Sequence, residues 1–285
     1  MPAPDNELAA YLRANRARLG PGDVGLALGG SGRRVAGLRR EEVAVLAGVS
    51  ADYYARLEQG RERSPSPQVI EAIGRALRLD PDSLGHLHRL AGLGPGTTRA
   101  TSDGDVHPDL LDLLHAFPRA AAYVLGPAFD VLAVNAVASA LLSPFGSERN
   151  MPRILFTHPN ARTVFTEWPV VTSATVQALR LNAGLHPGDE RISAVVDELR
   201  ACSAEFRTLW DDQRVSGLKR AYKVFVHPGV GRIELTYQTF EAHDAPGQQL
   251  LVGTPAPGSR SEEAAAHLAA MAPGGGAEDA RVPHT

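Results

Sequence analysis

Apolar and polar positions follow their most regular pattern between residues 39 and 60, which read RREEVAVLAGVSADYYARLEQG. The first part of this stretch predicts a short helix over 40–47, because apolar side chains recur on one side at helical spacing. Gly48 then supplies a turn, since glycine adopts a left-handed backbone conformation at little cost. The residues of this helix that we expect to face inward are Val43, Ala44 and Leu46.

A second short helix is predicted directly after this turn. Ser50 is a good N-cap, because its hydroxyl can accept a hydrogen bond from a free N–H group of the first helical turn. Val49 would fill the joint between the helices, and Tyr54 and Leu57 would form the buried edge of the second helix, which ends at Gly60. Two short helices joined by a glycine turn form the helix-turn-helix layout, whose second helix enters the major groove of DNA.

The open face of this second helix carries residues that we expect to contact DNA. Small side chains at Ala51 and Ala55 let the face approach base edges. There Asp52 can accept a hydrogen bond from cytosine, and Arg56 can donate to guanine. The alternative is an ordinary helical bundle, in which the same geometry occurs without DNA. The residues expected to position the helix on phosphates are Arg40, Ser50 and Tyr53.

Arginine is frequent around these predicted helices. Residues 20–38 form a long Gly-rich insert, which is either an unstructured loop or an arm whose Arg33 and Arg34 contact the phosphate backbone or a minor groove. Such a group of arginines is also common on a solvated surface. The arginines expected to contribute to DNA binding are Arg33, Arg34, Arg39, Arg40, Arg56, Arg61 and Arg63.

Residues 1–95 are expected to form an all-α domain. Within it, residues 7–19 place Leu8 and Leu12 on one stripe, which predicts a further helix. Residues 96–105 contain mainly Gly, Thr, Ser and Asp, which cannot build a core, so they are expected to be a linker.

The second half of the chain predicts an antiparallel sheet. Leu235 and Tyr237 alternate with polar residues, the period-two signature of a half-exposed strand. Two strands, several helices and then three strands over residues 106–257 predict a PAS-like sheet with helices on one face, so the whole chain is α+β. Residues 258–285 are expected to hold a short helix and a disordered tail. The expected strands are 121–125, 129–134, 222–226, 232–240 and 249–253, and the expected helices are 108–116, 135–142, 168–181, 189–201, 204–210 and 262–271.

Motifs in both halves resemble one known family. Residues 33–80 are similar to the phage-repressor-like (XRE) helix-turn-helix family and, more narrowly, to the MmyB-like transcription regulators. In the second half, RNMPRILF (149–156), FVHPGVG (225–231) and IELTYQTF (233–240) stand in that family's order, so the resemblance covers about residues 7–270.

This resemblance implies a cytosolic transcription regulator whose second domain resembles PAS and can hold a fatty-acid-like molecule. It also implies that the first domain has five helices, the first at 7–19 and the last two at 66–79 and 81–91. Glu58 is then structural and pairs with an arginine of the first helix, Arg16. The family often carries a histidine near position 213, where this chain has Gln213. That departure puts any shared polar contact from this loop in doubt.

A site for such a ligand would need an apolar lining and a few converging polar groups. Asn150 and Arg153 are candidates for the polar end, because arginine offers paired donors to a carboxylate. Alternatively, Arg153 pairs with Glu167 or Glu205, and the aromatic residues simply form the core. His227 precedes a proline in a predicted hairpin turn, which favours a structural role. The expected lining residues are Phe129, Leu132, Phe156, Phe165, Trp168, Trp210, Phe225 and Tyr237.

Composition and charge agree with two domains and leave DNA binding open. The chain has 285 residues, 44% of them hydrophobic, and a net charge of −3. Residues 1–95 hold 13 Arg and 11 acidic residues, a balance of +2, so the remainder carries −5. The single cysteine, Cys202, excludes a disulfide framework and a cysteine-based zinc cluster. We expect no signal peptide, no membrane partner and a cytoplasmic protein, because acidic residues stand near the start and the apolar segment 120–142 is interrupted.

These observations favour a regulator over an enzyme. The chain contains no HExxH, GxSxG or P-loop pattern, so we expect no catalytic residue, no metal site and no cofactor. We expect a homodimer that binds an inverted-repeat DNA operator and senses a small hydrophobic, fatty-acid-like ligand. The alternative is that the second domain binds a protein partner or only dimerises.

Overall fold

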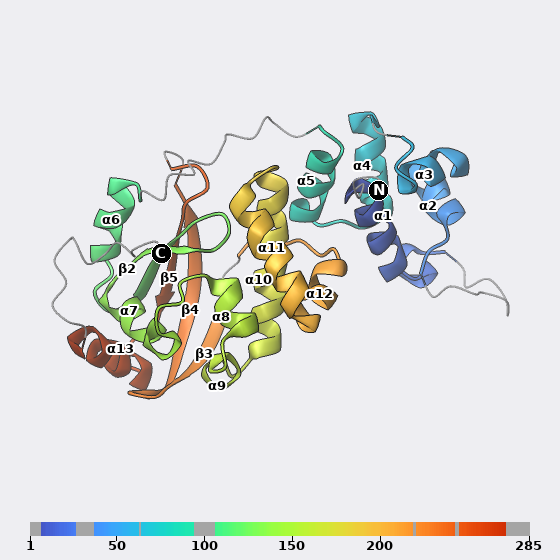
Figure 1. Ribbon diagram of the computed structural model, residues 1–285. Coiled ribbons are helices and arrows are strands. Elements are labelled where there is room, and N and C mark those ends of the chain that lie inside the picture. The colour runs from blue at the N-terminus through green and yellow to red at the C-terminus, as the bar shows by residue number, and fades with distance from the viewer. Residues whose placement is uncertain are drawn as a thin grey trace. The chain divides into compact units, whose positions relative to one another are not determined.

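The computed structural model describes residues 7–26, 37–62, 64–93, 106–218, 221–242 and 245–271. The chain divides into two compact units, Met1–Thr97 with Trp210–Val215, and Thr98–Leu209 with Ser216–Thr285. The first unit is helical and the second is built around a sheet, which confirms the α+β fold class (Figure 1). No helix among the described residues is long and apolar enough to cross a membrane. The expected linker, much of the Gly-rich insert and most of the expected tail lie outside the described residues.

The first unit contains the five predicted α-helices. Tyr54 and Leu57 of α3 are fully buried, as the pattern of apolar positions predicted, and so are Leu12, Val43 and Ile73 of the same unit. A short 3₁₀ helix, η1, occupies the start of the Gly-rich insert. The bounds are α1 Glu7–Arg18, η1 Pro21–Val24, α2 Arg40–Ala47, α3 Ala51–Glu58, α4 Pro67–Ala76 and α5 Pro81–Leu90.

The turn between α2 and α3 has the predicted geometry. Gly48 has a φ of 67°, in the left-handed region that glycine adopts readily. The Val49 N–H donates to the Ala44 carbonyl at 3.0 Å, and the Ser50 hydroxyl accepts from the Tyr53 N–H at 3.1 Å. The backbone groups left free by the ends of both helices therefore find partners within the turn itself.

The second unit is a five-stranded sheet with helices. All strand pairs are antiparallel, in the order β2-β1-β5-β4-β3. Figure 1 shows α8, α10 and α11 together beside the sheet, away from α6 and α13. The strands are β1 Ala121–Leu125, β2 Val131–Val134, β3 Ala221–His227, β4 Gly231–Glu241 and β5 Gln249–Thr254. The helices are α6 Pro108–His115, α7 Ala136–Leu142, η2 Ser143–Phe145, α8 Met151–Thr157, α9 Ala161–Val164, α10 Trp168–Leu185, α11 Glu190–Cys202, α12 Ala204–Asp211 and α13 Arg260–Met271.

Side chains from both faces of the sheet are buried. On one face Val124 and Val252 join a core with Leu110 and Leu114 of α6. On the opposite face Phe225 contacts Phe165, the residue that follows α9. Helices therefore cover both faces, and the expectation of helices on one face is corrected.

Two further differences from the sequence expectations concern the ends of elements. The strand expected from Phe129 begins at Val131, because Phe129 has a φ of 60° and its N–H bonds back to the Gly126 carbonyl in a turn. The helix expected within the tail, α13, packs against α7 and β4 and buries Ala265 and Leu268.

Candidate functional site

The exposed face of α3 is formed by short side chains and one ion pair. Ala51 and Asp52 are exposed, whereas Ala55 and Arg56 are half-buried. The Arg56 guanidinium donates to the Asp52 carboxylate and lies 5.7 Å from the centre of the Tyr53 ring. The two side chains that we expected to read bases thus contact each other. A base edge must therefore displace one of them from this exposed ion pair in order to bind the other.

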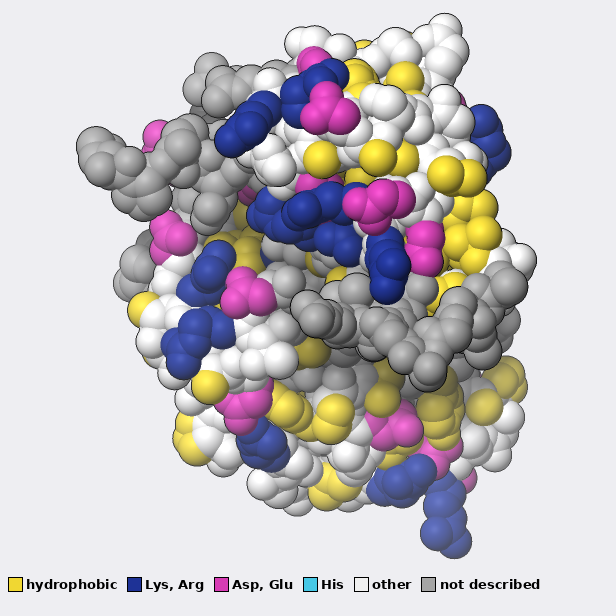
Figure 2. Space-filling view, turned by 90° about the vertical axis from the view of Figure 1, so that its right-hand side faces the viewer, with side chains coloured by type: hydrophobic (Ala, Val, Ile, Leu, Met, Phe, Trp, Pro, Cys, Tyr) yellow, Lys and Arg dark blue, Asp and Glu magenta, His cyan; other side chains and the backbone are white. Residues whose placement is uncertain are grey.

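Further arginines surround this face, with acidic residues among them. Figure 2, which views the side where α2 and α3 lie, shows Lys and Arg side chains gathered in one group beside Asp and Glu side chains. Arg39 and Arg61 are exposed, as contact with phosphates requires. Arg33, Arg34 and Arg63 lie outside the described residues.

A buried carboxylate, Glu58, fixes the base of α3. Its side chain is 0% exposed, and its oxygens accept from Arg16 Nε at 2.5 Å, from Arg16 Nη2 at 3.1 Å and from Arg40 Nε at 2.7 Å. Arg16 also donates to the Leu38 carbonyl at 2.7 Å. Burial alone would raise the pKa of Glu58, but the hydrogen bonds from the two arginines hold it below its usual value. The expected Arg16–Glu58 pair is confirmed.

Arg40 is the second partner of Glu58, which the sequence did not indicate. We expected this side chain to contact phosphate, but one edge of its guanidinium bonds to Glu58 while the side chain stays 42% exposed. Guanidinium carries five N–H donors in a planar fork, so one group can hold a carboxylate and still present donors outward. Arg40 therefore connects the buried ion pair to the surface of the first unit.

The expected ligand lining of the second unit separates into two aromatic groups. The first group is a row of four rings. Phe225 lies between Phe165 and Tyr237, with ring centres 5.2 Å and 6.1 Å away, and the ring centre of Tyr123 lies 6.3 Å from that of Tyr237. We call these four residues the sheet cluster. All four side chains are buried.

The second aromatic group lies among helices. Phe156 contacts Trp168 and Phe206 edge to face, with ring centres 5.9 and 5.1 Å apart. Arg162 stacks on Trp168, with its Cζ atom 3.9 Å from the ring centre. Trp210, near the end of α12, is buried, but it belongs to the first unit, which corrects its expected place in the lining of the second.

Leu132 and Phe129 join neither aromatic group. Leu132 belongs to the core under α6 with Val124 and Val252, so its expected place in the lining is corrected. Phe129 is buried in the hairpin turn, where its carbonyl accepts from the Met151 N–H at 3.0 Å. Both residues form structural contacts in the hairpin.

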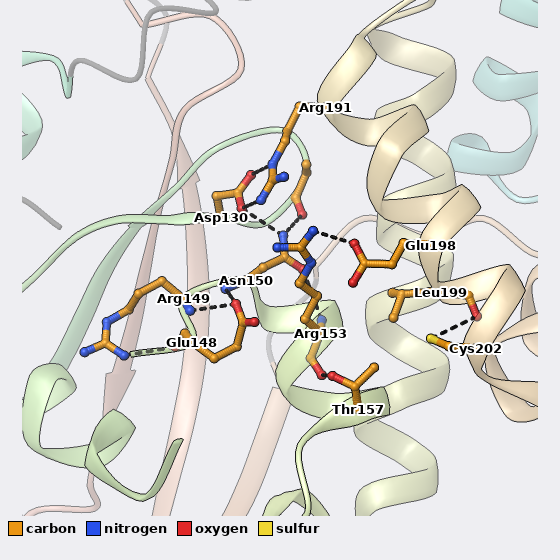
Figure 3. A network of polar contacts seen from close by, with 11 residues as sticks. Asp130, Glu148, Arg149, Asn150, Arg153, Thr157, Arg191, Glu198, Leu199 and Cys202 are labelled. Atoms are coloured by element: carbon orange, nitrogen blue, oxygen red, sulfur yellow. Dashed lines mark hydrogen bonds and ion pairs between the residues drawn. The ribbon is translucent and has the colours of Figure 1, made fainter. Parts of the chain in front are cut away.

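Asn150 sits in a polar network at the start of α8 (Figure 3). Its Nδ2 group donates to the Ala128 carbonyl and to Asp130, both at 3.0 Å, and its Oδ1 accepts from the Arg153 N–H at 3.0 Å. Arg191 donates twice to Asp130, at 2.8 and 2.6 Å. Burial would raise the pKa of Asp130, but the bonds from Arg191 and Asn150 lower it. Both amide hydrogens of Asn150 are used, so a ligand oxygen would have to displace one of these contacts.

Arg153 belongs to the same region but has a different acidic partner from the two expected. Its Nη2 donates to Glu198 of α11 (Figure 3). Glu205 pairs instead with Arg162, at 2.7 Å. The Nε atom of Arg153 is buried and has no acceptor among the described residues. One donor of this guanidinium is therefore still available.

His227 has the structural role that the sequence favoured. Its Nδ1 accepts from the Gly229 N–H at 3.1 Å, and its Nε2 lies 3.0 Å from the Ala140 carbonyl and 3.2 Å from the Ser143 hydroxyl. Burial lowers the pKa of His227, and the bond to Ala140 opposes this shift. The imidazole thus ties the β3–β4 hairpin to α7 and η2.

Sequence reasoning missed two polar residues on this face of the sheet. Tyr123 belongs to the sheet cluster, and Lys223 lies beside it. The Lys223 Nζ atom lies 4.8 Å from the centre of the Tyr237 ring. The sequence AYKVFVH of β3 has apolar residues on both faces, so no alternation indicates which side Lys223 takes. Lys223 and Phe225 are two residues apart on one strand, and this spacing alone places them on the same face of the sheet.

The comparisons with known proteins match both units. A family model described as the MmyB-like transcription regulator ligand binding domain matches residues 106–269, more than half of the chain, and a helix-turn-helix domain model matches residues 7–87. No curated protein matches the chain. Both matched families are regulatory. With the capped helix α3 and the sheet unit described above, the chain is a DNA-binding transcription regulator with a ligand-binding domain, and it belongs to the family of MmyB-like transcription regulators.

Proposed function

We propose that this regulator acts as a homodimer on an inverted-repeat operator. Each protomer would place α3 in a major groove, and the two-fold symmetry of the dimer would set the half-sites about 10 base pairs, one helical turn, apart. The exposed face of α3, with Ala51 at its start and Ser50 capping it, supports this proposal most directly.

Base recognition is proposed for Asp52 and Arg56, and phosphate contact for Arg39, Arg40, Ser50, Tyr53 and Arg61. Arg56→Ala should cost roughly 1–3 kcal/mol of binding free energy and relax the sequence preference at one position. Selection of binding sites from a random DNA library, with the wild type and the variant, measures this change. The control is Arg75→Ala, which removes an exposed arginine from the end of α4. An unchanged selected motif for Arg56→Ala would contradict the assignment.

For the second unit we propose a fatty-acid-like ligand. The support is the match to a ligand-binding family and the buried rings of the sheet cluster. Mass spectrometry of the denatured protein's extract should find a fatty-acid-like molecule near one per chain. Extracts without lipid, together with failure of the delipidated protein to bind added fatty acid, would reject this ligand.

A second candidate function for this unit is contact with a protein, either a partner or a second copy. Tyr222, Val226 and Phe240 are exposed on the β3–β4 part of the face that α6 covers elsewhere. Exposed apolar residues on one sheet face favour association. Light scattering on the full chain and on Val226→Asp separates the two functions, because loss of a dimer in the variant would assign this face to self-association.

A further inference from the structure

Lys223 lies on the same sheet face as the aromatic rings of the sheet cluster. In the register of β3, β4 and β5, Lys223 pairs with Leu235, and Tyr237 pairs with Gly253. Directly opposed residues of antiparallel strands share a face, as do residues two apart on one strand. Tyr123, which pairs with Leu251, therefore faces the same side as Lys223 and Tyr237.

The charge of Lys223 has no acidic partner. Lys223 is half-buried, and among the described residues its ammonium group has neither a hydrogen-bond acceptor nor a carboxylate within reach. Its Nζ atom lies over the Tyr237 ring. Burial lowers the pKa of Lys223 to about 8. A cation over an aromatic face gains some attraction, but this replaces only part of the lost hydration. An anion beside this amine would restore the missing interaction.

Two tyrosine hydroxyls accompany this amine. Burial raises the pKa of Tyr123 to about 12, although a hydrogen bond with Tyr237 opposes the shift, and burial raises the pKa of Tyr237 as well. Both hydroxyls are therefore protonated near neutral pH. A hydroxyl pair shares one hydrogen in its mutual bond, so one O–H hydrogen of the pair is left to donate.

The position of the Tyr237 ring depends on a glycine. A Cβ atom at Gly253 would lie 2.6 Å from Cζ of Tyr237, closer than real contacts allow. The ring therefore lies against the bare backbone of β5, where it can contact both Tyr123 and Lys223. One ammonium group and one free O–H match the two oxygens of a carboxylate, and the neighbouring rings of Phe165 and Phe225 match an apolar chain.

We propose that Lys223 and the Tyr123–Tyr237 pair hold the carboxylate of the ligand in the second unit. This inference rests on the proposed fatty-acid-like ligand and assigns its polar end to the sheet cluster. Arg153, the candidate from the sequence, already has Glu198 as a partner, so it contributes less to recognition of the charge.

The test compares two ligands that share one alkyl chain and differ in the head group, a charged carboxylate or a neutral hydroxyl. Delipidated full-length protein is titrated with dodecanoic acid and with dodecanol, which have the same chain, and affinities are measured by calorimetry. Wild type should prefer the acid by about tenfold or more. Lys223→Met, which keeps the volume but removes the charge, should lose this preference, whereas Lys223→Arg and Arg153→Met should retain most of it. Circular dichroism of each variant checks that it folds.

The pH dependence gives a second readout. In wild type, affinity for the acid should fall between pH 7 and 9.5, because the free amine loses its proton there, whereas Lys223→Arg should show a flat profile. The other titratable groups nearby do not change charge in this range. Tyr123 and Tyr237 stay neutral, and so does His227 on the same face of β3.

Each alternative outcome has a distinct meaning. If wild type binds the acid and the alcohol equally, or if Lys223→Met keeps the preference while Arg153→Met loses it, the assignment to Lys223 is wrong and the proposed ligand class stands. If wild type binds neither compound, both the assignment and the fatty-acid-like ligand are rejected.

Discussion

Each of the two units contains a charged side chain in an apolar environment, and these two side chains have opposite arrangements of partners. Glu58 in the first unit accepts three hydrogen bonds from Arg16 and Arg40. Lys223 in the second unit has only an aromatic ring beside it among the described residues. A buried charge with complete partners holds a fold together, whereas one without them is available to a ligand.

The pKa directions express the same difference. Partners overcome burial at Glu58, so its pKa falls and the charged form is stabilised by folding. Burial acts alone at Lys223, so its pKa falls to about 8 and folding disfavours the charged form. A downward shift therefore marks stabilisation for an acid and a cost for a base.

Removal of the Glu58 charge is the strongest way to test this comparison. Glu58→Gln should lower the free energy of unfolding by roughly 3–5 kcal/mol, because Arg16 and Arg40 lose their shared partner. Urea unfolding at pH 7 measures the change, with the exposed Glu41→Gln as the matched control. A loss no larger than that of the control would contradict a structural role for Glu58.

Acid should remove the same contribution in the wild type. The pKa of Glu58 is lower in the folded than in the unfolded chain, so its stabilisation is present above the unfolded value of about 4.3 and disappears as pH falls through the folded value. The difference in stability between wild type and Glu58→Gln should therefore shrink between pH 6 and pH 3. A constant difference across that range would show that the charge is not responsible.

The packing of Tyr237 is expected to give the next largest effect. Gly253→Ala should cost about 2 kcal/mol, since the added methyl group overlaps the ring and forces it to move. The same variant should lose its preference for dodecanoic acid over dodecanol, because the ring and Lys223 move apart. Unchanged stability, measured by urea unfolding, would show that the ring has room to shift.

Lys223→Met should have a smaller effect of the opposite sign. Removal of an unpaired buried charge should stabilise the ligand-free protein by roughly 1–2 kcal/mol at pH 7. The unfolded lysine has a pKa of about 10.4, so the wild type regains this stability as pH rises from about 8 toward that value. The gain from the variant should thus shrink at pH 10. Destabilisation by Lys223→Met at pH 7 would mean that the amine has a structural partner.

Arg40 sharpens the comparison because it serves both stability and DNA binding. Arg40→Ala should cost about 1 kcal/mol of stability, less than Glu58→Gln, since Arg16 still holds the carboxylate. It should also weaken binding to all DNA sites alike and reduce the slope of affinity against salt. Binding measured at several salt concentrations checks this. Retained affinity with an unchanged slope would assign Arg40 to the fold alone.

The first unit could be predicted in detail because its signals are local. Gly48 and Ser50 each act on backbone groups within four residues, so the sequence itself contains both partners of each contact. The second contact of Glu58 could not be predicted, because it depends on how far Arg40 lies from α3 after packing. Most elements of the second unit were also predicted, since apolar alternation and turn residues mark most of their ends. The short helices α8 and α9 were not among the expected helices.

The arrangement of side chains within the second unit was harder to predict. We expected eight apolar residues to form one ligand lining, but the structure separates them according to strand register, helix packing and a turn. Lys223 was missed because the apolar residues of β3 occupy both faces. Arg153 drew attention as an arginine near a motif, but its partner Glu198 lies 45 residues further along the chain.

The network around Asp130 also has a consequence for how the second unit folds. Its contacts join the β1–β2 turn to Asn150, 20 residues away, and to Arg191, 61 residues away. Contacts between such distant segments require large loops to close first, which slows folding and couples the segments to one another. The carboxylate of Asp130 therefore couples the β1–β2 turn to the start of α8 and the start of α11, three segments that lie far apart in the sequence.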